Sequence, residues 1–256
     1  MIDERACVHP DARIGSGVSI GPFSLIEADV SIGAGCTIGP HVVVRSGTRL
    51  GEENQIYQFC SIGEDPQFAG YDHEPTTLSV GNRNIIREYV TLNRGSPAGT
   101  GRTIIGDDNF LMAYVHIAHD SLLGNHTIFA NGASLAGHVE VGDFAILGGF
   151  TLVHQFCRLG AHCLTGIGTV CLKDVPPFVM ANGSTAELYG INTRGLRRRE
   201  FSEFTISSLK RAYKLLFRSG KELNAALDEL EPHAIDCKEI QQLVDFTRSS
   251  HRGLIR

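Results

Sequence analysis

Aliphatic residues recur at every sixth position over two long stretches of this chain. The first stretch runs from Ile14 to Ile62, and the second runs from Ile105 to Leu159. The residue after each aliphatic one is usually Gly or Ala, and a small or β-branched residue often stands four places after it. Neither an amphipathic helix nor a half-buried strand repeats in this way. A six-residue period indicates a parallel β-helix, so we predict an all-β solenoid whose triangular coils each contain three hexapeptides.

Two segments rich in Gly, Pro and polar residues interrupt this period, one at 64–78 and one at 95–101. Insertions in a repeat array become loops on one face, which is often the binding face. We expect both loops to extend over a neighbouring subunit or a substrate. We assign residues 1–190 to the β-helix with its two loops, and residues 191–256 to a C-terminal helical domain.

The C-terminal part has a helical rather than a hexapeptide period. Ser202 is the expected N-cap of a first helix, because its hydroxyl can accept from a backbone N–H of the first turn. A second helix is expected over 222–230 and should end before Pro232. A third should open with a capping box formed by Asp236 and Glu239.

The composition excludes several classes of protein. Apolar residues make up 42% and charged residues 20% of the 256, as in globular domains, and a net charge of −5 argues against binding nucleic acid. The chain does not start with a basic segment followed by an apolar one, and no apolar stretch approaches the roughly 20 residues that span a bilayer. Seven cysteines without a C-x-x-C pair favour a reducing, cytoplasmic setting. Four of them occupy the small position of the repeat and are expected to be buried: Cys36, Cys60, Cys157 and Cys163.

Histidines interrupt the repeat pattern in the second half of the solenoid. His119 and His138 are 19 residues apart, so they should lie one coil apart near the same edge. His154 stands where Gly or Ala is usual, and its ring needs space that we expect a cleft between subunits to provide. A pKa near 6.5 suits histidine to general-base chemistry at neutral pH. Asp120 follows His119 directly, and the two can pair only at a corner of the coil, because adjacent strand side chains point to opposite faces.

Two other interpretations stay open at this stage. His116 and His119 have a spacing of three, which a zinc-dependent trimeric β-helix hydratase could use. A zinc site needs three or four convergent ligands, and no ligand-rich set repeats across the expected faces, so we predict no metal. The third interpretation is a non-catalytic scaffold, which has no need for histidines at positions where the repeat uses small residues.

A strongly basic segment lies at the start of the helical part. The segment from Arg194 to Lys221 contains nine basic and two acidic residues, so it carries a net charge of +7 in a chain whose total is −5. The segment is either a solvated helix face or a docking surface for an acidic partner or for phosphates, which arginine binds with two parallel hydrogen bonds.

Several motifs together resemble the UDP-N-acetylglucosamine 3-O-acyltransferases, which catalyse the first step of lipid A synthesis. The resemblance covers essentially the whole chain, including Met1-Ile-Asp3 and Arg252-Gly-Leu-Ile-Arg256. The other motifs are His116-Ile-Ala-His-Asp120, Leu135-Ala-Gly-His-Val139, Val153-His-Gln-Phe-Cys157, Asp174-Val-Pro-Pro177, Gly195-Leu-Arg-Arg-Arg199 and Ala212-Tyr-Lys-Leu-Leu-Phe-Arg-Ser-Gly220.

The resemblance implies a left-handed β-helix homotrimer with active sites between subunits. It implies an acyl carrier protein thioester as the acyl donor, a nucleotide sugar as the acceptor, and no further cofactor. His119 would be the general base, Asp120 would orient it, and the N–H of Gly137 would stabilise the oxyanion. The expected substrate-binding residues are His116, His138, His154, Gln155, Gln67 and Asn93 around the cleft, and Asn192, Arg198 and Arg199 at the nucleotide or carrier end.

This chain also departs from the family pattern. The first loop lacks the usual lysine near Gln67, and Asn93 replaces a cleft histidine. Arg194 stands where an acidic residue usually follows the nucleotide-contacting Asn192. Ile167 occupies a position along the acyl groove that is commonly glycine, and a branched side chain there favours a shorter acyl chain. These differences leave open which sugar nucleotide is acylated, and whether the product is an ester or an amide.

Overall fold

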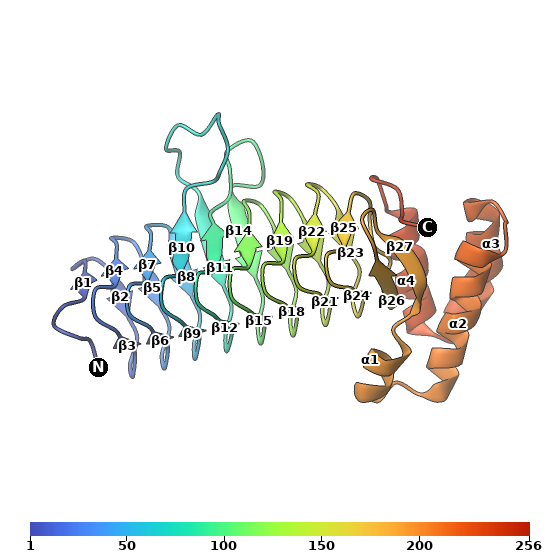
Figure 1. Cartoon of the computed structure of the whole chain (residues 1–256), viewed down its shortest axis with the longest axis horizontal. Helices are drawn as coiled ribbons and strands as arrows, with labels where there is room; N and C mark the ends of the chain where they lie inside the picture. Colours follow the sequence, from blue (N-terminus) through green and yellow to red (C-terminus); the bar gives the residue numbers. More distant parts are fainter.

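The computed structural model describes residues 1–256 as a long three-sided prism followed by four helices (Figure 1). Successive coils of the prism contribute short strands to three sheets, which are parallel except for the antiparallel pair of β26 and β27 at the C-terminal end. This arrangement confirms the predicted solenoid. The inward aliphatic side chains fill the prism as a continuous core, in which Ile26, Ile62 and Leu111 are fully buried. The four cysteines predicted to be buried are buried here, and burial raises the pKa of the Cys60 thiol to about 12.

The first sheet consists of β1 (Cys7–Val8), β4 (Leu25–Ile26), β7 (Val43–Val44), β10 (Ser61–Glu64), β13 (Thr91–Asn93), β16 (His116–Ile117), β19 (Ser134–Leu135), β22 (Leu152–Val153) and β25 (Val170–Cys171). The second consists of β2 (Arg13–Ile14), β5 (Ser31–Ile32), β8 (Thr48–Leu50), β11 (Thr77–Val80), β14 (Arg102–Ile105), β17 (Leu122–Leu123), β20 (Glu140–Val141) and β23 (Arg158–Leu159). The third consists of β3 (Ser19–Ile20), β6 (Thr37–Ile38), β9 (Gln55–Ile56), β12 (Ile85–Ile86), β15 (Phe110–Leu111), β18 (Ile128–Phe129), β21 (Ile146–Leu147), β24 (Leu164–Thr165), β26 (Val179–Asn182) and β27 (Glu187–Ile191).

Three edges join these sheets, and many of their turns hold a residue with positive φ. The first edge joins the first sheet to the second and includes Asp120, His138 and Phe156. The second edge, from the second sheet to the third, carries Asp108, His126, Phe144, His162 and Phe178. The third edge, from the third sheet to the first, carries Phe23, His41, Phe59, Tyr89 and Tyr114. This backbone conformation is unfavourable for a residue with a side chain, and contacts between rings one coil apart offset part of that energy. Along the third edge, for example, Tyr89 and Tyr114 stack at 4.9 Å.

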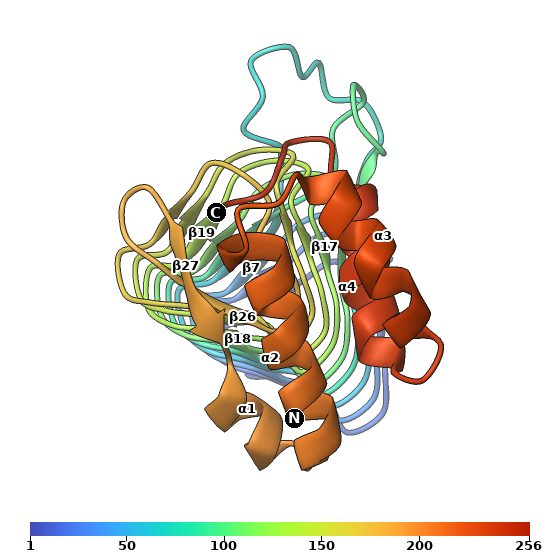
Figure 2. The same cartoon turned by 90° about the vertical axis from the view of Figure 1, so that its right-hand side faces the viewer.

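Both inserted segments leave the prism at the first edge and stand out from it as two neighbouring loops (Figure 1). The first follows β10 and the second follows β13, so they lie on successive coils. The helices gather at the C-terminal end of the prism, and the last residues of the chain return to the coil, where Leu254 pairs with Asp174 (Figure 2).

The four helices are α1 (Thr193–Arg198), α2 (Glu203–Arg218), α3 (Leu223–Ala234) and α4 (Lys238–Arg248). Ser202 caps α2 by accepting from the N–H of Thr205 at 3.0 Å, as predicted. The ends of the other two predicted helices were wrong. Pro232 lies inside α3, where it forfeits a single backbone hydrogen bond in the last turn. The N-cap of α4 is Cys237 rather than Asp236, and no side chain caps that helix. None of the helices is both long enough and apolar enough to cross a membrane.

Candidate active site

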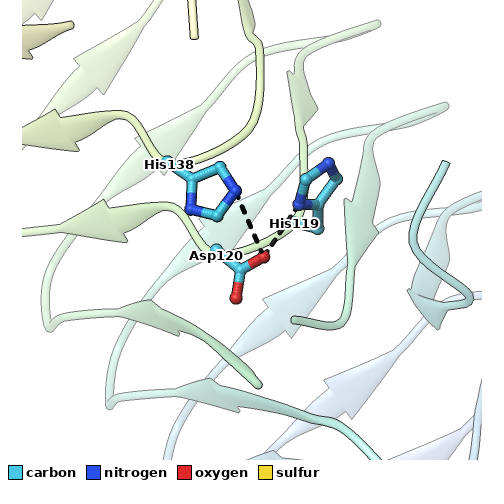
Figure 3. A group of neighbouring side chains, drawn as sticks. All are labelled: His119, Asp120 and His138. Carbon is cyan, nitrogen blue, oxygen red and sulfur yellow. Dashed lines mark hydrogen bonds and ion pairs between the residues drawn. The ribbon is translucent and has the colours of Figure 1, made fainter. Parts of the chain in front are cut away.

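The turn after β16 brings His119 and Asp120 together on the first edge. Asp120 has a φ of 60°, so the chain curls at the corner and the two adjacent side chains can meet. His119 Nδ1 lies 2.8 Å from Asp120 Oδ2 (Figure 3). The direct contact that the sequence allowed only at a corner is therefore present.

The second inserted loop encloses the carboxylate of Asp120. Oδ2 accepts from the N–H and hydroxyl of Ser96 and from His119, and Oδ1 accepts from the N–H and hydroxyl of Thr100 and from the N–H of Gly101. Burial alone would raise the pKa of Asp120, but the hydrogen bonds from Ser96, His119 and Thr100 outweigh it and hold that pKa below its usual value. The loop therefore folds onto its own chain, and the expectation that it also covers a neighbouring subunit or a substrate stays a prediction.

The contact with Asp120 determines which nitrogen of His119 can act as a base. A carboxylate only accepts hydrogen bonds, so Nδ1 carries the proton and Nε2 presents its lone pair. The imidazole lies directly over Gly137, where a Cβ would stand 2.8 Å from Nε2. Only glycine fits beneath the ring. The N–H of Gly137 donates to no backbone carbonyl of the chain.

His138 lies one coil from His119, as the spacing predicted. Their rings meet edge to face with centroids 5.2 Å apart, and His138 Nε2 lies 3.7 Å from Asp120 Oδ2 (Figure 3). The other face of the His138 ring stacks on Phe156 at 4.5 Å. Burial lowers the pKa of His138 more than the charge of Asp120 raises it. His138 is therefore neutral at neutral pH and can exchange hydrogen bonds with a polar ligand.

Three potential metal ligands converge here, which the sequence analysis did not expect. The nearest ligand atoms of His119, Asp120 and His138 all lie within 4.8 Å of one another. The six hydrogen bonds to Asp120 already use both of its oxygens, so this carboxylate is a poor metal ligand as it stands. His116 points its Nδ1 to the hydroxyl of Thr91 at 2.7 Å, and burial lowers its pKa. The arrangement fits a neutral histidine base better than a metal centre.

The first inserted loop approaches the same histidine. The Phe68 ring lies 6.3 Å from that of His119, while Gln67 is exposed. Asn93 is buried and donates from Nδ2 to the carbonyl of Asp65 at 2.6 Å, which anchors the base of the loop. The Oδ1 of Asn93 has no partner within the chain.

The remaining predicted residues lie further away. His154 and Gln155 are exposed on the first edge, beyond His138 along the prism. Asn192 caps α1 by accepting from the N–H of Gly195, and it donates to the carbonyl of His162. Together with Arg198 and Arg199 it lines a cavity of about 660 Å³ against the outer face of the third sheet. Ile167 is 80% exposed in the turn after β24. Within one chain, these last four residues lie on a different side of the prism from His119.

The sequence yielded no prediction for the loop residues that contact the His119–Asp120 pair, which we call the dyad. Ser96, Thr100 and Phe68 lie inside the two insertions, where the six-residue period is interrupted and predicts no neighbours. One signal was available for Ser96 and Thr100: a segment with three glycines and two hydroxyl residues immediately precedes the coil that carries Asp120.

The chain matches known proteins along its full length. Residues 174–255 match a family model described as UDP N-acetylglucosamine O-acyltransferase, domain 2, and residues 11–46 and 102–137 match bacterial transferase hexapeptide repeats. Curated acyl-[acyl-carrier-protein]–UDP-N-acetylglucosamine O-acyltransferases from Halorhodospira halophila and Thiobacillus denitrificans are each 54% identical over 255 residues, which is 100% of this chain and 99% of each relative.

Solved structures agree with these sequence matches. The UDP-N-acetylglucosamine acyltransferase of Francisella novicida superposes with a TM-score of 0.98 at 37% identity, covering 100% of this chain and 94% of that one. The corresponding enzyme of Bacteroides fragilis gives 0.98 at 41% identity, with 100% of both chains covered. These relatives are left-handed β-helices with a helical C-terminal part, as is this chain. With its dyad at the first edge and matches at this level, the chain belongs to the UDP-N-acetylglucosamine O-acyltransferase family of hexapeptide-repeat acyltransferases.

Proposed function

We propose that this protein transfers a 3-hydroxyacyl chain from acyl carrier protein to the 3-hydroxyl of UDP-N-acetylglucosamine. The observation that carries the proposal is the His119–Asp120 pair, whose free Nε2 lies beside the N–H of Gly137. The names of the curated relatives support the acyl donor and the acceptor. No such support exists for acylation of a different sugar nucleotide.

The proposed reaction needs one proton acceptor and one oxyanion donor. His119 Nε2 takes the proton of the sugar 3-hydroxyl as that oxygen attacks the thioester carbonyl. The N–H of Gly137 donates to the developing oxyanion, a contribution typically worth about 3 kcal/mol. When the intermediate collapses, the C–S bond breaks and the thiolate takes the proton from His119. Asp120 stays ionised and stabilises the imidazolium in between.

We propose a homotrimer with active sites between protomers, and the positions of the predicted substrate residues support sites that combine two copies of the chain. The dyad occupies the first edge, while Asn192, Arg198 and Arg199 line a cavity against the third sheet. Because the two groups lie on different sides of the prism in one chain, we expect one nucleotide sugar to contact groups from two copies. We therefore propose that each active site combines the first edge of one protomer with the α1 region of the next.

The acyl carrier protein is the proposed partner of the basic segment. A cavity of about 790 Å³ between β27 and α2 is lined by Lys210, Arg211, Lys214 and Arg218. Cations on a groove of this size suit an acidic partner. With the acyl carrier thioester as co-substrate, the proposed reaction needs no further cofactor. We also propose that the protein acts in the cytoplasm.

Ile167 is the proposed selector of acyl-chain length. Its side chain stands out from the prism, and a branched side chain at the edge of an acyl groove shortens the groove. We expect a preference for shorter acyl chains than glycine would allow.

The test offers the purified protein a panel of sugar nucleotides and acyl-carrier thioesters of several lengths, with products identified by mass. We expect an ester of UDP-N-acetylglucosamine. A product formed only with another sugar nucleotide, or an amide, would replace this proposal with that of a divergent relative.

A further inference from the structure

The first inserted loop is fastened at its base by Arg94, which follows β13 and immediately precedes the second inserted loop. The Arg94 guanidinium donates to the carbonyl of Ser46 and to the hydroxyl of Tyr71, each at 2.9 Å, and it pairs with the carboxylate of Asp65. Only 12% of the Arg94 side chain is exposed. One buried arginine therefore ties the start and the middle of the first loop to the base of the second.

This attachment holds the ring of Phe68 against His119. The two ring centroids are 6.3 Å apart, and the ring planes are tilted by 50°. Gly70 leaves room for the ring, because a Cβ at position 70 would stand 2.9 Å from it. Phe68 is 39% exposed and is not part of the hydrophobic core. A loop of mainly polar residues thus places an apolar ring beside the proposed base, where it contributes nothing to the core.

The second inserted loop covers the dyad as well. Gly99 lies so close to the Asp120 carboxylate and to the His138 ring that a Cβ at position 99 would stand 2.5 Å from each. With the two loops in place, only 14% of the His119 side chain is exposed, and none of the Asp120 side chain. His119 is therefore largely screened from solvent, although it lies at a corner of the prism.

This screening bears on the choice between two nucleophiles. Water can attack the thioester by the same route as a sugar hydroxyl. His119 Nε2 takes a proton of water while the oxygen bonds to the carbonyl carbon, then the C–S bond breaks and the thiolate takes the proton from His119. The products are a free carboxylic acid and the carrier thiol, so the acyl group is lost. Neither His119 nor the N–H of Gly137 distinguishes water from an alcohol, so the choice depends on what can reach the base.

We propose that Phe68 is a specificity-determining residue that keeps water away from His119, and that Arg94 positions it there. An apolar ring suits this role because a water molecule beside it loses hydrogen bonds that the ring cannot replace. The sugar hydroxyl still reaches Nε2, because binding of the rest of the nucleotide sugar directs it there. This inference rests on the proposed function and adds a residue of the first loop to the determinants of acceptor choice.

The experiment compares Phe68→Ala and Phe68→Leu with Phe23→Ala. Phe23 is the matched control, because it is also an exposed ring beside a histidine, His41 at 5.1 Å, but on the third edge. Release of the carrier thiol without nucleotide sugar measures hydrolysis, and the mass of the acylated sugar measures transfer. For Phe68→Ala we expect the ratio of hydrolysis to transfer to rise about tenfold, while the KM for the nucleotide sugar stays unchanged. Phe68→Leu should keep most of the discrimination, since leucine is also apolar, and Phe23→Ala should match the parent.

Tyr71→Phe tests the attachment without removing the buried Arg94. It deletes one of the hydrogen bonds that hold the first loop, so the same ratio should rise by a smaller factor than in Phe68→Ala. All variants are compared at the melting temperature and oligomeric state of the parent.

An unchanged ratio in Phe68→Ala, with normal transfer, would overturn the inference and leave the proposed function intact. A higher KM for the nucleotide sugar without added hydrolysis would also overturn it, because Phe68 would then be a contact of the acceptor. The same holds if Phe23→Ala raises the ratio as much as Phe68→Ala does. A parent protein that neither hydrolyses the thioester nor transfers its acyl group would overturn both proposals.

Discussion

The first and second edges of the prism present histidine in nearly the same setting, yet only one of them forms a candidate active site. His138 on the first edge and His162 on the second have φ values of 61° and 58°. Each ring stacks on a phenylalanine from the next coil toward the C-terminus, His138 on Phe156 at 4.5 Å and His162 on Phe178 at 5.5 Å. The coil geometry therefore does not distinguish a reactive histidine from a structural one.

The polar partner makes the difference. On the first edge an inserted loop holds Asp120 ionised beside His119 and His138. On the second edge His162 also stacks on Phe144 and meets Phe201 edge to face, and its Nδ1 has no hydrogen-bond partner. The repeat provides positions for aromatic rings. The inserted loop provides the hydrogen bonds that keep the Asp120 carboxylate ionised next to two of these rings.

The largest effect is expected from His119→Ala. Removal of the general base should lower kcat by roughly a thousandfold, within the usual range for general-base catalysis. The matched control is His126→Asn on the second edge, which should keep its activity because the His126 ring pairs with Asp108 and stacks on Phe144, away from the first edge. Kinetics and melting temperature are measured for both. Near-normal turnover of folded His119→Ala would remove this residue as the base.

Asp120→Asn tests the polar partner directly. The amide cannot stabilise an imidazolium, and its NH₂ group faces donors from Ser96 or from Thr100, depending on which oxygen it replaces, so kcat should fall about a hundredfold and the melting temperature should also fall. Asp108→Asn is the matched control, because Asp108 has the same backbone conformation on the second edge and pairs with Arg83 at 2.8 Å. Equal losses of kcat in Asp120→Asn and Asp108→Asn would mean that the Asp120 carboxylate has no specific role in catalysis.

Ser96→Ala measures how much the inserted loop contributes. Its hydroxyl donates to Asp120 at 2.6 Å, and loss of one hydrogen bond to a charged group should lower kcat about tenfold while KM stays unchanged. Ser24→Ala removes an equally buried hydroxyl, which donates to the carbonyl of Gly39 far from the dyad, and should leave kcat as it was. A change in KM alone would point to a role in substrate binding instead.

The regular part of the molecule was predictable because its spacing is periodic. The six-residue period located the strands, and a separation of 19 residues correctly placed His138 beside His119. The insertions were not predictable, since the contacts of Ser96 and Thr100 with Asp120 span 24 and 20 residues and follow no repeat. The helix ends at Pro232 and Cys237 were wrong for a different reason. α3 and α4 pack against each other and against α2, and such tertiary packing, which local capping signals do not report, supplies most of the stability of a helix in a protein.

The smallest effect concerns the stability of the second edge at acid pH. Burial, with a smaller contribution from Arg199, lowers the pKa of His162 to about 4, although Asp143 and Glu239 act in the opposite direction. Above the unfolded-state pKa near 6.5 the ring is neutral in both states and stability does not depend on it. As the pH falls from 6.5 to 4, the unfolded chain takes up a proton that the folded chain resists, and stability is lost.

His162→Phe should remove this loss, because phenylalanine fills the same aromatic stack and does not titrate. The expected gain relative to the parent is on the order of 1 kcal/mol at pH 5, after allowance for solvent screening of a half-buried ring, and close to zero at pH 7. Chemical denaturation at the two pH values measures both differences. His162→Gln separates titration from stacking: it should be destabilised equally at both pH values, because it loses the ring contacts without gaining a titratable group. If His162→Phe loses as much stability on acidification as the parent, then the second edge does not contain the buried neutral histidine that distinguishes it from the first.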